Sequence, residues 1–474
     1  MNVAPSQSVS VIGAARSGIA AARVLHQLGM RVTLSDSQSI EKLDAGLLAE
    51  IASQGIRFVP AASVAEALPG EADLVVTSPG VPQTAPVLQE AIRRGLPVWS
   101  EIELAYTIAR APIVATTGTN GKTTTTLLIQ AMLTAGGFEA VAAGNVSADE
   151  IKKTLIEAAY ESKSNSEKVI LVAEISSFQL EWVAHFAPRV GILTNITPDH
   201  LNRHADFDAY ATTKMRLFAA QAANDWAILN FDDPVVRAAG QAGVRAQRLW
   251  ATLEPSSTTA GPIVRVCQGQ VCVLRKPGES EVPLFPVDAL PPSLPGRHNL
   301  MNSMMAGAAA WLMGAAPEAI ESALRAFRGV AHRMEFVANI DGVPYVNNSM
   351  CTNTAAAIAS LEAVSGPVVV ILGGAEKGLD YAPLVPTLHK KARGTILIGA
   401  AADMLERTFR KGGYTALQRA GSLEEAVETA RHLAVSGDTV LLSPACASFD
   451  MFRDFEARGV AFRNAVRAIK ERTA

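Results

Sequence analysis

Short apolar runs and helical patterns alternate along almost the whole chain. The clearest runs lie at residues 9–12, 169–172 and 368–372, and each consists mainly of Val, Ile and Leu. Continuous apolar runs bounded by turn residues are typical of strands buried in parallel sheets, and the helical patterns between them supply the crossover connections. The pattern therefore predicts an α/β fold.

The predicted strands fall into three blocks, which we interpret as three domains. A chain of 474 residues is too long for one core and agrees with domains of ~150 residues each. We place the domains at residues 1–100, 101–329 and 330–474. The remaining strands are predicted at residues 32–34, 74–76, 113–114, 190–193, 226–229, 345–346, 395–398 and 440–442.

Composition excludes several classes of protein. The net charge of −3 gives no basic face for nucleic acid. No 18-residue apolar stretch is free of charged or turn residues, so no membrane span is predicted. The first residues lack the basic and apolar regions of a signal peptide. We expect a cytoplasmic protein and a monomer, although the residues themselves carry no signal for oligomeric state.

The four cysteines are too few for a disulfide framework in a chain of this size, which fits a reducing compartment. Cys267 and Cys272 flank a Gly–Gln pair within an alternating apolar pattern. That arrangement predicts a β-hairpin rather than a metal site.

A glycine loop lies between the predicted strand at residues 113–114 and a helical pattern. Its glycines let backbone N–H groups turn toward a polyphosphate, and the helix start adds the positive end of its dipole. Lys122 would reach the terminal phosphates, and the Thr123 hydroxyl would meet Mg²⁺. Thr116 stands where the usual pattern has its first glycine. The loop predicts nucleoside triphosphate binding through Gly118, Thr119, Asn120, Gly121, Lys122, Thr123 and Thr124.

Polar residues also follow two later strands of the second block. Glu174 comes directly after one strand, where a carboxylate beside the phosphate loop can hold Mg²⁺; a solvated loop glutamate is the alternative. Asp199 and His200 lie in the loop after the next strand, and His200 could ligate a metal or orient a carboxylate. By its pattern alone, Lys214 is predicted to lie on the surface of a helix.

The first block offers a weaker signal for a second nucleotide. Gly13 and Gly18 follow the first strand in the manner of a dinucleotide fingerprint, but the middle glycine is missing. A tight turn without a ligand is the alternative. Ser78 and Gly80 follow another strand of this block, so a phosphate-bearing group is favoured, and a sugar nucleotide fits as well as NAD.

Together these motifs resemble the muramyl ligase family, the ATP-dependent amide ligases of peptidoglycan precursor synthesis. The resemblance rests on residues 118–123, 174–181 and 195–200, and extends to residues 296–302 and 332–335. It implies a Rossmann-like N-terminal domain for a UDP-linked substrate and a central P-loop ATPase-like domain with a mainly parallel sheet. It also implies a Rossmann-like C-terminal domain for glutamate.

The resemblance also implies roles that the residues alone do not show. Lys214 would be carbamylated by CO₂ and would hold a second Mg²⁺ with His200, which replaces the surface interpretation. The implied cofactors are ATP and two Mg²⁺ ions, the latter held by Thr123, Glu174, His200 and Lys214. Further contacts with ATP would come from Asn299, Asn302, Arg333 and Asn348.

Residues 373–380 and 443–450 resemble the glutamate-adding members of the family. The implied reaction adds D-glutamate to UDP-N-acetylmuramoyl-L-alanine through an acyl phosphate. Its catalytic residues would be Lys122, Asp199, His200 and Lys214, with Asp199 and His200 as candidate acceptors of the amine proton. The UDP-substrate residues would be Arg16, Ser17, Asp36, Ser37, Ser78, Gly80 and Asn145, and the glutamate residues Thr352, Lys377, Ser448, Phe449 and Phe455.

Two residues depart from the family pattern. Asn348 stands where the family has Asp, and Met350 stands where it has Lys, so the pair of changes preserves net charge. Loss of a charge-assisted contact in the transition state costs about 2–4 kcal/mol. Two alternatives therefore stay open: a ligase with a different acceptor such as L-glutamate, and a non-catalytic nucleotide-binding homologue.

Overall fold

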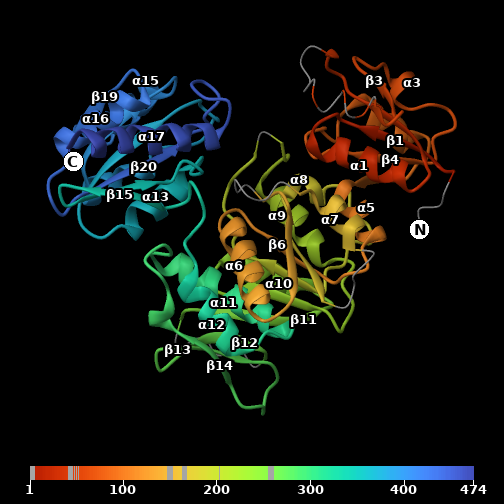
Figure 1. Ribbon diagram of the computed structural model, residues 1–474, viewed down its shortest axis with the longest axis horizontal. Coiled ribbons are helices and arrows are strands. Elements are labelled where there is room, and N and C mark those ends of the chain that lie inside the picture. Colours follow the sequence, from red (N-terminus) through yellow and green to blue (C-terminus); the bar gives the residue numbers. More distant parts are fainter. Residues whose placement is uncertain are drawn as a thin grey trace. The chain divides into compact units, whose positions relative to one another are not determined.

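The computed structural model describes residues 6–40, 46, 49, 51, 53–146, 153–162, 168–201, 203–254 and 261–473. Strands of these residues form three sheets, coloured red to orange, orange to green, and teal to blue in Figure 1. Contacts group the chain into two compact units. One contains Met1–Val287 and Met301–Leu324, and the other contains Asp288–Leu300 and Arg325–Ala474.

The first sheet lies in the first unit and has the strand order β3-β2-β1-β4-β5, with every neighbouring pair parallel. In this order β1 leads directly to α1, so the turn between them lies at the carboxyl edge of the sheet. The strands are β1 (Ser8–Ile12), β2 (Arg31–Ser35), β3 (Arg57–Val59), β4 (Leu74–Thr77) and β5 (Val98–Ser100). The helices are α1 (Arg16–Gln27), α3 (Val64–Ala67), α4 (Pro86–Arg93) and α5 (Glu101–Ile108).

The second sheet, in the same unit, has the order β14-β13-β12-β11-β10-β9-β6-β8-β7. Its strands from β12 to β7 are parallel, and β12, β13 and β14 form an antiparallel edge. The strands are β6 (Ile113–Thr117), β7 (Glu139–Gly144), β8 (Val169–Glu174), β9 (Val190–Leu193), β10 (Trp226–Asn230), β11 (Gln247–Thr252), β12 (Ile263–Cys267), β13 (Gln270–Leu274) and β14 (Val282–Pro286).

Helices cover this sheet because its central strands bury both faces. Every residue of β8 is buried, as expected of a strand in the middle of a parallel sheet. The helical elements are α6 (Lys122–Ala135), α7 (Leu155–Glu161), α8 (Ser177–Leu180), α9 (Phe207–Met215), η3 (Arg216–Phe218), α10 (Pro234–Gly243), η4 (Val287–Ala289), α11 (Arg297–Leu312) and α12 (Pro317–Ala326).

The third sheet lies in the second unit, with the order β15-β16-β20-β17-β18-β19 and one antiparallel pair, β15 with β16. Helix α16 buries residues at helical spacing, Leu423, Ala426, Val427 and Ala430. The strands are β15 (Glu335–Ile340), β16 (Val343–Asn347), β17 (Val368–Gly373), β18 (Ala392–Ile398), β19 (Leu417–Arg419) and β20 (Thr439–Ala445). The helices are α13 (Thr354–Ala363), α14 (Leu384–Lys391), α15 (Ala402–Lys411), α16 (Leu423–Leu433) and α17 (Phe455–Thr473).

The predicted α/β class with mainly parallel sheets is confirmed. The predicted hairpin is also confirmed, because Cys267 of β12 pairs with Gln270 of β13 across Gln268 and Gly269, which have positive φ angles. Such two-residue turns suit the twist of a hairpin. Within the described part of the chain, we find no helix whose length and hydropathy would let it cross a bilayer.

The turn between β1 and α1 generates a prediction about stability. A Cβ atom on Gly18 would lie 1.9 Å from the carbonyl oxygen of Gly13 and 2.6 Å from Ser78 Oγ. Because the nearest obstacle is backbone, Gly18→Ala should lower the free energy of unfolding by about 3 kcal/mol. Gly70→Ala, whose Cβ would meet nothing within 4 Å, is the matched control. Equal melting temperatures for the two variants would contradict this packing.

Candidate active site

The phosphate loop has no room for side chains at its two glycines. Gly118 has φ +146° and Gly121 has φ +85°, conformations that favour glycine. A Cβ atom on Gly118 would lie 1.9 Å from Thr194 Oγ1, and one on Gly121 would lie 2.5 Å from Asn302 Oδ1. The loop therefore packs directly against the segment after β9 and against α11, which brings Asn302, one of the residues predicted to contact ATP, next to the loop.

Hydrogen bonds fix the backbone of this loop. Asn195 Oδ1 accepts from the Asn120 N–H at 2.9 Å, and Asn195 Nδ2 donates to the Asn120 carbonyl at 2.9 Å. Thr119 Oγ1 lies 3.1 Å from the hydroxyl of Tyr210 and accepts from the Thr197 N–H at 3.0 Å. A phosphate-binding turn held in this way is organised before any ligand arrives.

Thr123 and Glu174 meet at the start of α6. Thr123 Oγ1 donates to Glu174 Oε2 at 2.7 Å, and Asn145 Nδ2 lies 3.5 Å from Glu174 Oε1. Both Thr123 and Glu174 are buried, and Lys122 Nζ donates to the Thr119 carbonyl at 2.9 Å. A hydroxyl and a carboxylate side by side are oxygen donors of the kind that Mg²⁺ prefers.

Lys214 is buried, so the pattern-based prediction of a surface lysine is wrong. Its side chain is 2% exposed, its Nζ donates to the Gly118 carbonyl at 2.8 Å, and the ammonium lies 4.6 Å from the centre of the Tyr210 ring. Burial, with a further contribution from the positive charge of Lys122, holds the pKa of Lys214 well below its usual range. The neutral amine is therefore strongly favoured compared with an exposed lysine.

His200 adopts a left-handed backbone conformation with φ +54°, which is uncommon for a residue with a side chain. Its Nε2 lies 3.8 Å from Asp199 Oδ2, and its ring meets the Phe178 ring edge-on at 4.9 Å. The described residues contain no cluster of three or more His, Cys, Asp or Glu that could hold a metal ion. A metal held by Thr123, Glu174, His200 and Lys214 would thus depend on a hydroxyl and a modified lysine.

Most of the predicted UDP-substrate residues surround one hollow of about 280 Å³ in the first unit. Ser78 Oγ donates to the Gly13 carbonyl at 2.8 Å, which joins the two strand ends. Asp36 does not line the hollow; its carboxylate accepts from the N–H groups of Ala14 and Gln38 and fixes the turn. Ser37 is exposed and is also outside the lining, which includes Arg16, Ser17, Ser78, Gly80, Asn145 and Gln179.

A buried carboxyl group lies behind this hollow. Glu101 is 1% exposed, and its Oε1 accepts from Gln179 Nε2 at 2.7 Å. Its Oε2 has no hydrogen-bond partner among the described residues. Burial raises the pKa of Glu101 to about 7, although the side chains of Gln179 and Ser17 act in the opposite direction.

In the second unit, the two residues that depart from the family pattern contact neutral groups and an arginine. Asn348 Nδ2 donates to Ser360 Oγ at 2.6 Å, and its Oδ1 accepts from the Met334 N–H at 3.2 Å. Met350 Sδ lies 2.7 Å from Arg333 Nη2. Arg333 and Asn348 are thus close in space. Asn299 lies at the start of α11, where its Nδ2 donates to the Pro295 carbonyl.

The predicted glutamate residues follow strands that end at one edge of the third sheet. Ala375 and Ala447 exchange backbone hydrogen bonds, and the Ala445 N–H donates to the Cys351 carbonyl. These bonds bring together the three loops that carry the predicted residues. Lys377 is exposed, Phe449 is 75% exposed, Ser448 is buried, Thr352 is half-buried, and Phe455 begins α17.

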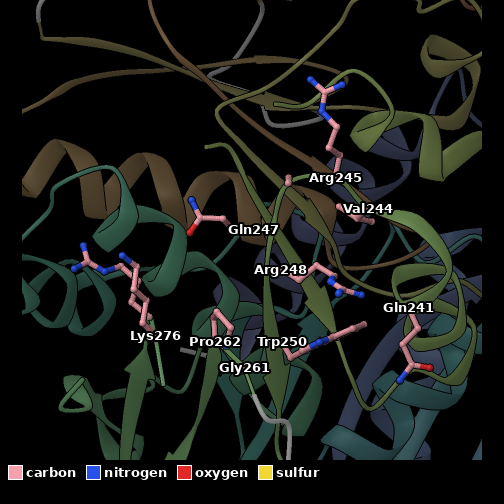
Figure 2. Close-up of a pocket in the computed structure, with 11 residues that line it drawn as sticks. Gln241, Val244, Arg245, Gln247, Arg248, Trp250, Gly261, Pro262 and Lys276 are labelled. Carbon is pink, nitrogen blue, oxygen red and sulfur yellow. The ribbon is translucent and has the colours of Figure 1, made fainter. Parts of the chain in front are cut away.

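A hollow of about 560 Å³ lies elsewhere on the first unit (Figure 2). Arg245, Gln247 and Arg248 lie at the start of β11, and Lys276 follows the end of β13. Since β13 runs antiparallel to β12, both places are at the amino edge of the sheet, opposite the phosphate loop. None of the predicted site residues lines this hollow.

Three residues that support the site were not among the predicted ones. Asn195 and Tyr210 hold the phosphate loop, as described above. Arg458 is 1% exposed and donates to the carbonyls of Ser349, Cys446 and Ala447. Asn195 stands next to a strand end in a polar loop, which is a usable sequence signal. Tyr210 and Arg458 lie inside helical patterns, where nothing in the spacing marks them.

Sequence profiles of known families match three parts of the chain. The profile described as "Mur ligase MurD-like, N-terminal domain" matches residues 7–100. The "Mur ligase middle domain" matches residues 116–310, and the "Mur ligase, glutamate ligase domain" matches residues 332–446.

Curated relatives match the chain over nearly their whole length. The UDP-N-acetylmuramoylalanine--D-glutamate ligase of Pelotomaculum thermopropionicum is 40% identical over 98% of each chain. The ligase of the same name from Geobacter metallireducens is 42% identical over 98% of each chain.

Solved structures share the fold at low sequence identity. A pseudomurein peptide ligase type C from Methanothermus fervidus matches with a TM-score of 0.57 and 20% identity, over 98% of this chain and 100% of that one. The UDP-N-acetylmuramate-alanine ligase MurC from Thermotoga maritima matches with a TM-score of 0.56 and 16% identity, over 98% and 99%.

The raised pKa of Glu101 predicts a specific pH dependence of stability. The ordinary pKa of a glutamate side chain is 4.5, and the pKa of Glu101 in the folded state is about 7. Between these two pH values the folded state binds the proton more tightly than the unfolded state does. Stability therefore falls as the pH rises through this window, by about 3 kcal/mol. The glutamine of the Glu101→Gln variant cannot titrate, so the variant should not show this loss. The free energy of unfolding of the variant, relative to that of wild type, should therefore rise by about 3 kcal/mol between pH 4.5 and pH 8.

Denaturant unfolding of both proteins across this pH range measures the effect. Glu424→Gln, on the exposed face of α16, controls for the loss of one negative charge. Parallel pH curves for wild type and Glu101→Gln would show that the carboxyl group titrates normally.

The contact between Met350 and Arg333 predicts that positions 348 and 350 are coupled. Met350→Lys alone would place an ammonium against a guanidinium and should destabilise the protein by about 1 kcal/mol. Adding Asn348→Asp should recover at least half of that loss. A double-mutant cycle on unfolding free energies measures the coupling. Met350→Leu, which adds no charge, should show none; equal coupling for Leu and Lys would rule out an electrostatic origin.

Proposed function

The chain belongs to the Mur ligase family, and we propose how its residues carry out the reaction of the glutamate-adding members. That reaction is the ATP-dependent addition of D-glutamate to UDP-N-acetylmuramoyl-L-alanine, a step of peptidoglycan precursor synthesis. The observation that carries this conclusion is the match of ligases with this name over 98% of both chains. Neither the L-glutamate variant nor a non-catalytic homologue is favoured by these relatives.

The first step takes place at the phosphate loop. A carboxylate oxygen of the UDP-linked substrate attacks the γ-phosphorus of ATP, an O–P bond forms, and ADP leaves. We assign the UDP-linked substrate to the hollow lined by Arg16, Ser17 and Asn145. Support comes from Asn145, which both lines that hollow and reaches Glu174 beside the phosphate loop. The loop amides and Lys122 would position the polyphosphate and balance its charge.

Mur ligases use ATP and Mg²⁺, and the residues present suit the metal. Bound Mg²⁺ neutralises charge on the phosphoryl group during transfer. Thr123 and Glu174 form one pair of oxygen donors. We propose that His200 and a carbamylated Lys214 would hold a second ion.

The chemistry of Lys214 favours this modification. A neutral amine attacks the carbon of CO₂, an N–C bond forms, and one proton is released to give a carbamate anion. Burial and the nearby charge of Lys122 lower the pKa of Lys214, which keeps the amine in its reactive neutral form. The product would place a negative charge near the positive charge of Lys122, and that change is electrostatically favourable.

In the second step, the amine of glutamate attacks the acyl carbon, an amide bond forms and inorganic phosphate leaves. The attacking nitrogen must lose a proton, and we assign Asp199 and His200 as the candidate acceptors. We assign glutamate to the edge of the third sheet, where Lys377 offers a positive charge to a carboxylate. Ser448 and Thr352 supply hydroxyl groups there, and Phe449 and Phe455 supply apolar surface. Asn299, Asn302, Arg333 and Asn348 remain our assignments for ATP.

The partners are small molecules, and we propose a monomer in the cytoplasm. All four cysteines are free thiols, which supports a reducing compartment.

The reaction predicts a strict dependence on the acceptor. Phosphate release should require UDP-N-acetylmuramoyl-L-alanine, ATP, Mg²⁺ and D-glutamate together, and the product should gain the mass of one glutamate residue. L-Glutamate and omission of the amino acid should each give rates at least about 100-fold lower, since the acyl phosphate then lacks its nucleophile. Phosphate release at the same rate without any amino acid would overturn the ligase proposal.

Carbamylation predicts chemical rescue at position 214. Lys214→Ala should lower kcat by about 10³-fold, because a ligand to the metal and a charge are both lost. A small carboxylate such as acetate should restore part of the activity. Intact-mass measurement of wild type in bicarbonate buffer should also show an added CO₂ that Lys214→Ala does not acquire. Full activity of the alanine variant without rescue would refute the assignment.

A further inference from the structure

Arg203 uses one side of its guanidinium group to bind the carboxylate of Glu181, the residue that follows α8. Arg203 lies three residues after His200, in the loop that also carries Asp199. Its Nε donates to Glu181 Oε1 at 2.9 Å, and its Nη2 donates to Glu181 Oε2 at 2.6 Å. Glu181 is 4% exposed. A carboxylate at that depth requires a paired cation, so the position of Arg203 is strongly constrained.

The same guanidinium group also contacts the loop after β4. It donates to the carbonyls of Pro79 at 3.3 Å, Gly80 at 3.4 Å and Val81 at 2.7 Å. Pro79 and Gly80 line the hollow that we assign to the UDP-linked substrate. One side chain thus joins the loop of the first sheet to the second sheet through five polar contacts.

The Phe178 ring links Arg203 to the proposed catalytic loop. The guanidinium carbon lies 5.1 Å from the ring centre. The rings of His200 and His204 lie 4.9 Å and 5.9 Å from the same ring. A shift of Arg203 would therefore disturb both the substrate loop and the packing of His200.

The geometry of arginine explains why this residue type is needed. A guanidinium group is planar and carries five N–H donors in a fixed fork. It can meet both oxygens of Glu181 and still reach carbonyls on its other side. A lysine has a single nitrogen in place of this fork, so it can keep the charge pair with Glu181 but cannot make all five contacts at once.

We propose that Arg203 is a positioning residue that fixes the substrate loop, residues 78–81, relative to the loop bearing Asp199 and His200. This inference rests on the proposed function, since it assigns the hollow to the UDP-linked substrate. Arg203 sets where the substrate carboxylate lies with respect to the phosphate loop. It acts through these two loops and makes no contact with the reacting atoms.

A conservative substitution separates this role from simple stabilisation. Arg203→Lys keeps the charge and should raise the KM for the UDP-linked substrate at least tenfold, while the KM for ATP changes less than threefold. Arg237→Lys is the matched control. Like Arg203, Arg237 contacts an aromatic ring and a backbone carbonyl: its guanidinium carbon lies 5.0 Å from the centre of the Phe231 ring, and its Nη1 donates to the Phe231 carbonyl at 3.1 Å. Arg237 lies in α10 and Phe231 follows β10, so this contact does not involve the first sheet. This control should leave both KM values within twofold of wild type.

The outcomes are distinguishable from a failure of the proposed function. Calorimetric binding of UDP-N-acetylmuramoyl-L-alanine in the absence of ATP tests Arg203 without turnover, and Arg203→Lys should weaken it at least tenfold. If Arg203→Lys does not fold, Glu181→Gln provides a second test. It preserves the shape of the side chain but removes the charge that Arg203 binds, so it should also raise the KM for the UDP-linked substrate. Unchanged KM and binding in a folded Arg203→Lys variant, with only a lower melting temperature, would overturn the proposal. Absence of amide formation by wild type would overturn the proposed function instead.

Discussion

The site depends on how closely the phosphate loop approaches the segment after β9. At Gly118 even one methyl group would overlap Thr194 Oγ1, and at Gly121 it would overlap the carboxamide of Asn302. The side chains of Thr194 and Asn195 donate hydrogen bonds to the Asn120 carbonyl, and Asn195 also accepts one from the Asn120 N–H. Because these groups are bonded within the protein, the turn keeps its shape without a ligand. The direction in which the amides of the loop point is therefore set by packing and not by the nucleotide.

This close packing has an electrostatic consequence. The amine of Lys214 lies against the Gly118 carbonyl, away from water and within the influence of Lys122, Asp199 and Glu174. Burial and the charge of Lys122 lower the pKa of Lys214, and the two carboxylates oppose this change but do not offset it. A group in that position is more stable neutral or as an anion paired with a cation. The environment thus favours the modification that the family resemblance implied for Lys214.

The sequence predicted those features that depend on local pattern. Buried strands such as β8 and β17 are continuous apolar runs in the sequence, and the hairpin of β12 and β13 followed from the Gly–Gln pair between Cys267 and Cys272. The phosphate loop was evident because strand, glycines and helix are contiguous. Features that depend on long-range packing were not predictable in this way. Lys214 has the sequence context of an exposed helical lysine. It is buried because its helix packs against the phosphate loop, where its amine meets the carbonyl of Gly118, 96 residues earlier in the chain.

Asp36 illustrates a related difficulty. The resemblance assigned it to the UDP-linked substrate, and in the structure its carboxylate accepts from two backbone N–H groups that form the turn. A carboxylate at a strand end can meet a ligand, hold the loop that meets it, or do both, and the sequence is the same in each case. Its hydrogen-bond partners within the protein become known only from the fold.

Two side chains link elements of the first and second sheets. Gln179 joins α8 to Glu101 of α5, and Arg203 joins Glu181 to the loop after β4. Such bonds are worth more in a buried setting, because a broken one leaves a desolvated group without a partner. Apolar packing also joins the two sheets, because one cluster of buried side chains contains residues of both, and the polar contacts around the hollow add to it. In the proposed reaction the substrate carboxylate would have to meet the phosphate loop in a defined geometry, so a rigid arrangement of these elements would serve the chemistry.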